Sequence, residues 1–299
     1  MDSMPIISFI IAYHNEPEAF LQACLESIMA LPFEKGEAEI IVVDDGSTLP
    51  PTVQDGVKLV RQEQAGLSVA RNTGIDHAQG RYIQFVDADD CFIPSAYEAV
   101  VDELRNGQTD VVMFRMTTSQ QHATKKAKAN ADEVRHIWRG QGSHYLQHHN
   151  LRAAACGYAF RHECLGELRF LPGILHEDEL FTPLLFLRAN SLVELNVKAY
   201  YYRQHDGTIT HAKSPKAINK RLNDIHFIIK ELQSLDNPLL ERRIRQLTVD
   251  YLQNTWTLTH RLSDLRRRGS ELQEEGLMPL PAKRYSPRYF CVSLLSKAL

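Results

Sequence analysis

Three carboxylates fall within four positions of the segment FVDADD, at Asp87, Asp89 and Asp90. Carboxylates this close repel one another unless a cation joins them. Mg²⁺ and Mn²⁺ prefer oxygen ligands and commonly bridge a carboxylate to substrate phosphates, where they stabilise a departing diphosphate as Lewis acids. The segment therefore predicts a divalent-cation site, and a solvated acidic turn is the structural alternative.

Two further acidic pairs could also do chemistry. Asp44 and Asp45 belong to the turn-forming segment DDGS. Glu177 and Asp178 belong to HEDELF, which opens an apolar helical segment ending near Ala189. Each pair has a structural alternative, because aspartate favours turns and acidic residues are stabilised at a helix N-terminus by the helix dipole. Their meaning therefore depends on where the fold places them.

The first hundred or so residues alternate between strand and helix patterns. Expected strands are residues 6–12, 39–43, 57–60, 82–86 and 111–114, and expected helices begin near Phe20, Leu67 and Ser95. This alternation predicts an α/β fold, a mostly parallel sheet with helices on both faces. Such sheets bind ligands at the carboxyl ends of their strands, where both the Asp44–Asp45 pair and the Asp87–Asp90 cluster are expected.

The chain changes character past Lys213, where long helices are expected. Near-heptad apolar spacing predicts one helix that packs on the main domain or on a partner chain, through Ile244, Leu247, Tyr251, Leu258, Leu262 and Leu265. Ser286–Pro287 suits a helix start. The tail after it is basic and amphipathic, a pattern that fits either an anionic membrane surface or docking onto the protein, and docking is the favoured interpretation.

Composition narrows the class of protein. The 299 residues carry a net charge of −3, which gives no reason to expect a nucleic-acid partner. Five scattered cysteines without a CxxC pair argue against a disulfide framework or structural zinc and favour a reducing compartment. The apolar run near the N-terminus is about seven residues long, and no run reaches the roughly eighteen of a membrane helix, so the cytoplasm is the expected location.

The segment AYHNEP, at the end of the first expected strand, argues against three other classes of enzyme. A dinucleotide oxidoreductase needs GxGxxG at this place, and a nucleotidyltransferase would carry a glycine-rich phosphate loop. A phosphatase of the aspartyl-phosphate type needs its nucleophile there. None of these features is present at this position.

Four blocks occur in the order SFIIAYHNEP, IIVVDDGS, GLSVARNTGIDHAQGRYIQFVDADD and HEDELF. In order and spacing they resemble the inverting glycosyltransferases of family 2, over roughly residues 5 to 210. The resemblance implies a GT-A (Rossmann-like) fold in residues 1–212, with a donor half of about 1–115 and an acceptor half of about 116–212. Residues 213–299 would form a C-terminal helical extension.

The same resemblance implies a donor-nucleotide site. Asp45 would accept a hydrogen bond from the donor base, typically uracil N3–H, and Asp87 would contact the ribose. The backbone around Ala12, with Tyr13 and Asn15, would line the base pocket, although the family more often has proline where this chain has Ala12. Arg71 and Asn72 would have a donor-site role, in which Arg71 faces the donor phosphates, and the alternative is that Arg71 orders the aspartates.

For metal and catalysis, the resemblance implies that Asp89 binds Mn²⁺ or Mg²⁺ and that Asp90 supports it, without deciding which ligates more directly. His205 or His211, in the stretch YYYRQHDGTITH, could add a metal ligand or a phosphate contact. Asp178 would act as general base, because an inverting displacement needs a base on the acceptor side to take the hydroxyl proton. Glu177 would bind the acceptor.

The function implied is sugar transfer, with inversion, from a nucleotide diphosphate donor such as a UDP-sugar to an acceptor hydroxyl. The acceptor would be a saccharide or lipid-linked saccharide, in cell-surface polysaccharide or lipopolysaccharide synthesis, with peripheral contact at the inner face of the cell membrane through the C-terminal tail. The sequence leaves the oligomeric state open, a homo-oligomer included. The alternative is a non-catalytic nucleotide-sugar-binding or scaffold protein of the same fold.

Overall fold

The computed structural model describes residues 4–119, 136–204 and 214–296. Its N-terminal part contains β1 (Ile7–Tyr13), α1 (Glu18–Met29), β2 (Ala38–Asp45), β3 (Val57–Gln62), α2 (Leu67–His77), β4 (Tyr82–Asp87), β5 (Cys91–Phe92), α3 (Pro94–Asn106) and β6 (Val111–Thr117). The middle contains β7 (His136–Gly140), α5 (Gly142–His148), η2 (Ala155–Gly157), β8 (Tyr158–Arg161), η3 (His162–Cys164), α6 (Asp178–Arg188) and β9 (Leu192–Tyr201). The C-terminal part contains α7 (Pro215–Ser234), η5 (Pro238–Leu240), α8 (Glu241–Thr259), α9 (Leu262–Glu274) and α10 (Pro287–Leu295).

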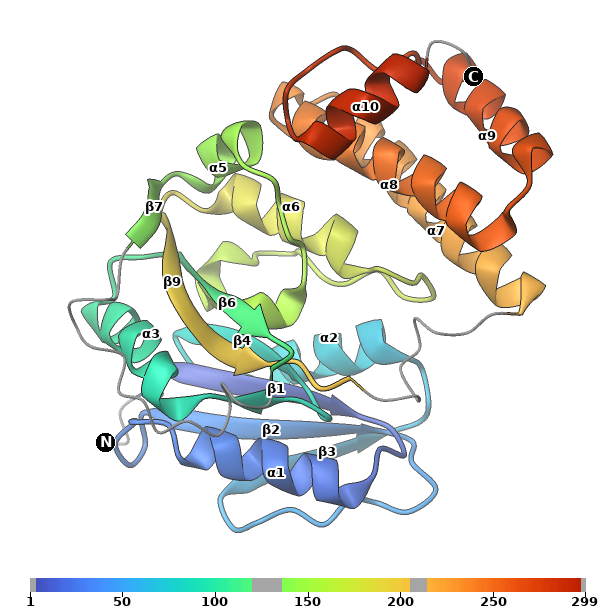
Figure 1. The fold of residues 1–299 in the computed structure, drawn as a ribbon. Coiled ribbons are helices and arrows are strands. Elements are labelled where there is room, and N and C mark those ends of the chain that lie inside the picture. The colour runs from blue at the N-terminus through green and yellow to red at the C-terminus, as the bar shows by residue number, and fades with distance from the viewer. Residues whose placement is uncertain (1–3, 120–135, 205–213, 297–299) are drawn as a thin grey trace.

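The N-terminal half of the sheet is parallel, in the strand order β3-β2-β1-β4. Its centre, β1, reads ISFIIAY and is buried on both faces, as a continuous apolar run predicts. Phe9 faces the core shared with α1 and α3, while Ile10 faces the core shared with α2. Helices therefore cover both faces, as expected for an α/β fold (Figure 1).

The second half of the sheet is mixed. In the described residues the order continues β4-β8-β6-β9-β5, with β7 pairing to β9. The strand β8 is antiparallel to both β4 and β6, and β9 is parallel to β6. The strands β8 and β9 lie beyond residues 111–114, the last strand for which sequence analysis gave bounds. The four-residue β8 is too short to show a periodicity, so sequence analysis missed it.

The C-terminal stripe belongs to two helices, where one was expected. His260 adopts a left-handed conformation, with φ of 52°, and its N–H donates to the carbonyl of Trp256. This ends α8 at Thr259, and α9 begins at Leu262. Glycine is the residue that usually marks such a helix end, and its absence here hid the break from sequence analysis.

The C-terminal helices share a core with the middle of the chain. One hydrophobic cluster contains Tyr158 and Phe186 together with Ile228 of α7 and Leu247 of α8. The proposed domain boundary near residue 212 falls within residues 205–213, outside the described part, and stays a prediction. The stripe on α8 packs within this chain, and a homo-oligomer likewise remains a prediction.

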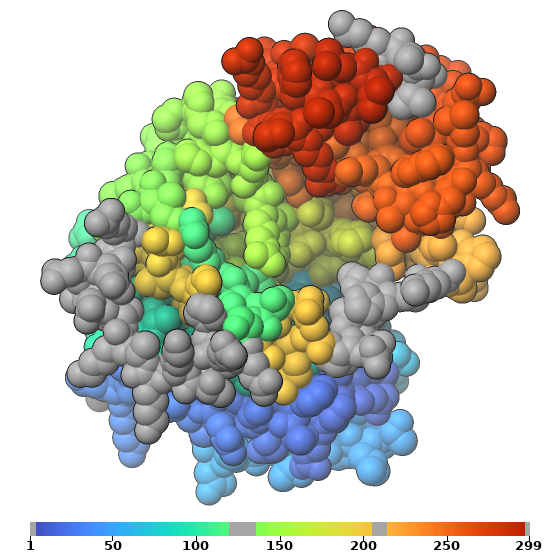
Figure 2. All heavy atoms as spheres, in the orientation of Figure 1, coloured from blue at the N-terminus to red at the C-terminus, as the bar shows by residue number. Residues whose placement is uncertain are grey.

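The helix α10 docks on α8, on the outer surface of the C-terminal helices (Figure 2). Its start is as predicted, because the Ser286 side chain accepts a hydrogen bond from the Tyr289 N–H. Tyr289 is buried against Val249 and Leu280. Leu294 and Leu295 point away from this contact and are exposed. In the described residues, no helix is both long and apolar enough to cross a bilayer.

Candidate active site

The sheet register brings the two acidic clusters to one edge. Ala12 is the partner of Val43 on β2 and of Asp87 on β4, and Tyr13 is the partner of Asp44. Because these strands are parallel, their carboxyl ends lie together. The aspartates of DDGS and FVDADD therefore flank the end of β1 on its two sides, as the sequence predicted.

Asp45 is buried and is bound by backbone and side-chain donors. Its Oδ1 accepts hydrogen bonds from Gln62 Nε2 at 2.7 Å and from the Ala65 N–H at 2.8 Å, and its Oδ2 accepts from the Gly66 N–H at 2.7 Å. An ionised carboxylate offers about four acceptor positions. Three of these positions accept hydrogen bonds from the end of β3 and from the loop that leads into α2. The fourth position, on Oδ2, can accept a hydrogen bond from a ligand.

The loops after β1 and β2 are tied together around His14. The Nδ1 of His14 donates to the Asp45 carbonyl at 2.7 Å. Asn15 has a φ of 55°, and its N–H donates to Ser47 Oγ at 2.9 Å. The hydroxyl of Tyr13 donates to the Glu16 carbonyl. Tyr13 and Asn15 thus shape the loops beside Asp45, and their contact with a base stays a prediction.

The FVDADD turn is held by the end of β9 and by the residues that follow it. The N–H of Arg203 donates to Asp90 Oδ1 at 2.7 Å, and its Nε donates to the Asp89 carbonyl at 2.7 Å. Tyr200 Oη accepts from the Asp87 N–H at 3.1 Å. These contacts span more than a hundred residues, and no spacing in the sequence indicated them.

This turn has the chemistry of a cation site. Ligand atoms of Asp87, Asp90 and Cys156 lie within 4.8 Å of one another, and Asp90 Oδ2 has no hydrogen-bond partner in the described residues. Burial, together with the neighbouring Asp87, raises the pKa of Asp90 to about 8. A divalent cation would offset both the burial of the Asp90 charge and its repulsion by Asp87. The aspartates therefore fit Mg²⁺ or Mn²⁺.

Cys156 is an unsuitable ligand for such a cation. Burial raises the pKa of its thiol well above the ordinary value, which keeps it protonated, and thiolate sulfur suits softer metals. Asp87 and Asp90, with Asp89 in the same turn, are therefore the candidate holders. The sequence favoured Asp89 as the ligand and Asp90 as support, and the grouping of Asp90 with Asp87 makes Asp90 an equal candidate.

Arg71 joins the turn to α6. It is 6% exposed, its Nη2 lies 3.1 Å from Asp87 Oδ1, and its Nη1 lies 2.5 Å from Glu177 Oε1. Its guanidinium also lies 5.2 Å from the ring centre of Phe170. This geometry favours the interpretation in which Arg71 orders the carboxylates. Direct contact with donor phosphates stays a prediction.

The helix α2 carries Arg71 to this place through a close approach to β1. A Cβ on Gly74 would come within 2.2 Å of Ile10 Cγ2, so only glycine allows α2 to lie this near the strand. The Asn72 amide exchanges two hydrogen bonds with the backbone of Phe170, at 2.8 and 2.9 Å. A donor-site role for Asn72 stays a prediction.

Asp178 is the first residue of α6, after the left-handed turn at His176. Burial is the main cause that raises its pKa to about 7, and Glu177 adds to the shift. Arg71 and Arg243 act in the opposite direction. Arg243 is itself buried and pairs with Glu179, so a residue of α8 helps to set the charge on Asp178.

A pocket of about 340 Å³ is lined by Asp87 of the FVDADD turn and by Glu177 and Asp178 of α6 and its N-cap. We call it the reaction pocket, and its lining includes Arg71, Asp87, Arg152, Glu177, Asp178 and Arg221. A carboxylate with a pKa near neutrality beside a candidate cation site is the pattern expected of a catalytic centre. Glu177 lines this pocket but is paired with Arg71, so its role as an acceptor ligand stays a prediction.

Some site residues were missed by sequence analysis, and one predicted residue cannot be placed. The residues missed lie outside the four sequence blocks: Arg152, Tyr200, Arg203 and Arg243. Tyr200 and Arg203 belong to the stretch YYYRQHDGTITH, in which only the histidines were singled out. The tyrosine-rich run before Arg203 was the only signal near it. His211, like His205, lies outside the described residues, so its proposed metal contact stays a prediction.

An acidic turn at the carboxyl end of the parallel strand β4, near a carboxylate whose pKa is raised to about 7, is a candidate catalytic centre of a nucleotide-binding enzyme. The sequence profile of Glycosyl transferase family 2 matches residues 8–169, more than half of the chain. The chain therefore belongs to glycosyl transferase family 2.

Curated relatives agree with this membership. Glycosyltransferase GlyG of Streptococcus pneumoniae is 25% identical over 87% of this chain and 91% of its own length. The uncharacterized glycosyltransferase EpsJ of Bacillus subtilis is 27% identical over 73% of this chain and 67% of its length. The chain matches only 35% of glycosyltransferase GlyA of Streptococcus pneumoniae, at 25% identity over 78% of this chain.

Solved structures show the same GT-A fold. Staphylococcus aureus TarS, residues 1–349 in complex with UDP-GlcNAc, has a TM-score of 0.66 at 19% identity, over 98% of this chain and 91% of that chain. The mannosyltransferase PcManGT from Pyrobaculum calidifontis, in complex with GDP-Man and Mn²⁺, has a TM-score of 0.56 at 14% identity, over 99% of this chain and 88% of that chain. At these identities the likeness concerns the fold.

Proposed function

We propose that the protein transfers a sugar from a UDP-linked donor to an acceptor hydroxyl, with inversion at the anomeric carbon and with a divalent cation. The observation that carries this proposal is the reaction pocket, which Asp87 enters from the end of β4 and Asp178 from the start of α6. The UDP-GlcNAc in TarS and the Mn²⁺ in PcManGT support the choice of donor and cation.

Each group in the pocket has a role in this proposal. Asp45 binds the base through the free position on Oδ2, and Asp87 binds the ribose. Asp89 and Asp90 hold Mn²⁺ or Mg²⁺, which neutralises charge on the leaving diphosphate. Asp178 takes the proton of the acceptor hydroxyl as its oxygen bonds to the anomeric carbon and the bond to the diphosphate breaks. Arg71 positions Asp87 and Glu177.

The proposal extends to cell-surface polysaccharide synthesis on the cytoplasmic side of the membrane. One curated relative is the poly(ribitol-phosphate) β-N-acetylglucosaminyltransferase TarS, 26% identical over 65% of this chain and 35% of its own length. All five cysteines are free thiols, which suits a reducing compartment. The exposed side of α10 is the proposed peripheral contact with the membrane.

The donor proposal is tested by thermal unfolding with UDP, GDP, CDP or TDP, each with and without Mn²⁺. We expect UDP with Mn²⁺ to stabilise the protein most, because they are the proposed donor nucleotide and its cation. A ligand that binds only the native state adds about 2.7 kcal/mol to the free energy of unfolding at a hundred times its dissociation constant. Asp89→Ala and Asp90→Asn, measured separately, show which carboxylate binds the cation. Asp102→Asn, an exposed change on α3, is the control. A protein that no nucleotide stabilises at millimolar concentration would favour the non-catalytic alternative.

The proposed base also predicts a pH dependence. Asp178 must be deprotonated to accept a proton, and its pKa is raised to about 7. The rate of transfer should therefore rise with pH through about 7 and fall roughly tenfold per pH unit well below it. The measurement is kcat/KM of UDP-sugar transfer between pH 5 and 9 at saturating cation. A rate that is flat down to pH 5 would contradict the assignment of Asp178.

A further inference from the structure

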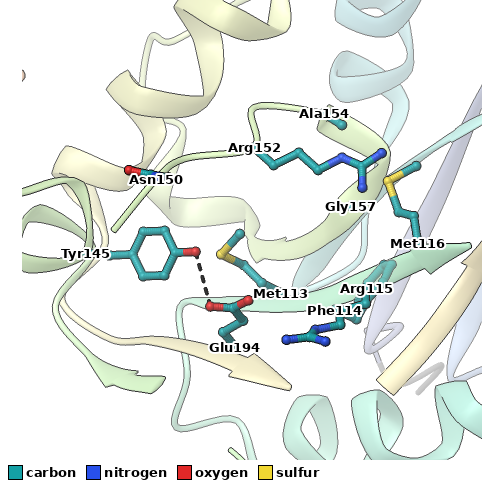
Figure 3. A pocket seen from close by; sticks show the side chains of 10 residues that line it. All are labelled: Met113, Phe114, Arg115, Met116, Tyr145, Asn150, Arg152, Ala154, Gly157 and Glu194. Atoms are coloured by element: carbon teal, nitrogen blue, oxygen red, sulfur yellow. Dashed lines mark hydrogen bonds between the residues drawn. The ribbon is translucent and has the colours of Figure 1, made fainter. Parts of the chain in front are cut away.

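A second pocket, of about 280 Å³, opens beside the reaction pocket. We call it the side pocket, and Figure 3 shows the side chains that line it. Met116, Arg152 and Ala154 line both pockets, so the two pockets adjoin. A molecule whose reacting hydroxyl lies at Asp178 can therefore extend past Arg152 into the side pocket. The acceptor half of the chain supplies the residues that line it, apart from three residues of β6.

The side pocket carries two arginines without an ion pair. Arg115 comes from β6 and Arg152 from the loop before η2 (Figure 3). Within residues 4–119, 136–204 and 214–296, neither guanidinium has a hydrogen-bonding or ionic partner. Arg71, by contrast, is fully engaged by carboxylates. Both arginines are exposed. An arginine presents a planar fork of donors that suits phosphate and carboxylate, so the two that line this pocket are available to bind an anion.

The opposite wall provides groups that suit a sugar ring. Tyr145 donates from Oη to Glu194 Oε2 at 3.1 Å, and burial raises the pKa of Tyr145, so this phenol keeps its proton (Figure 3). The bond fixes the Glu194 carboxylate, whose Oε1 can accept a hydrogen bond from a sugar hydroxyl. Met113 and Met116 add an apolar surface. The wall therefore offers both polar and apolar contacts.

The balance of charge differs between the two pockets. In the reaction pocket the three carboxylates are matched by three arginines, one of them the shared Arg152, so its lining is balanced in charge. In the side pocket, two arginines outweigh the single carboxylate of Glu194. An acceptor that is neutral at its reacting end and anionic farther along matches this distribution.

We propose that the acceptor is a saccharide that carries a phosphate or carboxylate group, which Arg152 and Arg115 bind in the side pocket. This inference rests on the proposed function, since it takes Asp178 as the place of the reacting hydroxyl. It names a substrate class for the acceptor and assigns both arginines a role in acceptor specificity.

The test is calorimetric titration of protein saturated with UDP and Mg²⁺, so that the donor site is filled. The probes are glucose 6-phosphate, glucuronate and the neutral methyl β-glucoside, which distinguish phosphate from carboxylate. We expect at least one anionic probe to bind about tenfold more tightly than the neutral one, as charge-assisted bidentate contacts allow. Arg152→Gln and Arg115→Gln should each remove most of this preference. Arg266→Gln, which removes the same charge on the exposed surface of α9, should keep it.

Three outcomes would overturn the inference. One is equal affinity for all three probes, and another is the same loss in Arg266→Gln as in Arg152→Gln. The third is a loss of UDP affinity in Arg152→Gln with the anion preference unchanged, which would assign Arg152 to the donor. UDP binding to the unmodified protein is measured first. Its absence would contradict the proposed function, whereas the probes, titrated alone, still decide whether the side pocket prefers anions.

Discussion

We expect Asp178→Asn to reduce the proposed sugar transfer by about 10²- to 10⁴-fold, the range that a positioned general base contributes. The amide keeps the shape of the carboxylate but cannot take the proton of the acceptor hydroxyl. Donor binding should change little, because Asp178 lies at the start of α6, whereas the proposed nucleotide contacts come from the ends of β1, β2 and β4. The measurement is kcat for transfer, together with the dissociation constant of UDP with Mn²⁺.

The control for this experiment is Asp102→Asn, which makes the same chemical change on the exposed surface of α3. It should transfer sugar at the unmodified rate. Asp178→Asn should also lose the rise in rate through pH 7, since the titrating group is gone. Retention of more than about a tenth of the transfer rate would remove Asp178 from the role of base. A matching loss of UDP affinity would indicate a misfolded pocket, which the thermal unfolding curve would reveal.

The part of the fold that sequence analysis predicted is the part built from buried parallel strands. Runs such as ISFIIAY are apolar without interruption because both faces of β1 are covered. Their ends are marked by turn-forming aspartates, so the place of Asp45 and Asp87 followed from local pattern. The mixed half of the sheet gave no such signal, because β8 spans four residues and owes its pairing to β4 and β6.

Site residues within the four sequence blocks could be predicted from the sequence. The residues that hold them in place could not. Asp178 could be named from HEDELF. Its raised pKa could not, because the pKa is raised by burial in the folded protein and is partly offset by Arg71 and by Arg243 of a distant helix. Arg203 binds the turn at Asp89 and Asp90 only because β9 returns beside β5. Such contacts arise from topology, and a single sequence contains no periodic trace of them.

Arg71→Ala should be the most destabilising of the site variants. The arginine is buried, and its removal leaves Asp87 and Glu177 without their shared cation. Breaking a buried ion pair from one side costs about 3–5 kcal/mol, because the remaining charge is buried and uncompensated. Arg169→Ala is the control, since Arg169 pairs with the exposed Asp76 near the end of the same helix. Exposed pairs contribute about 0–1 kcal/mol. Urea unfolding at pH 7.5 measures both free energies.

The same variant tests whether Arg71 also sets the charge of the base. Arg71 lowers the pKa of Asp178, against burial and Glu177, which raise it. Without Arg71 the pKa of Asp178 should rise above about 7, so the pH at which transfer is half-maximal should move upward. Arg71→Met loses the charge but keeps an apolar side chain over the Phe170 ring. It should show the same upward shift of the pH midpoint and be less destabilised than Arg71→Ala. An unchanged midpoint in both variants would limit Arg71 to holding the pocket together, and a downward shift would contradict the charge arrangement proposed for it.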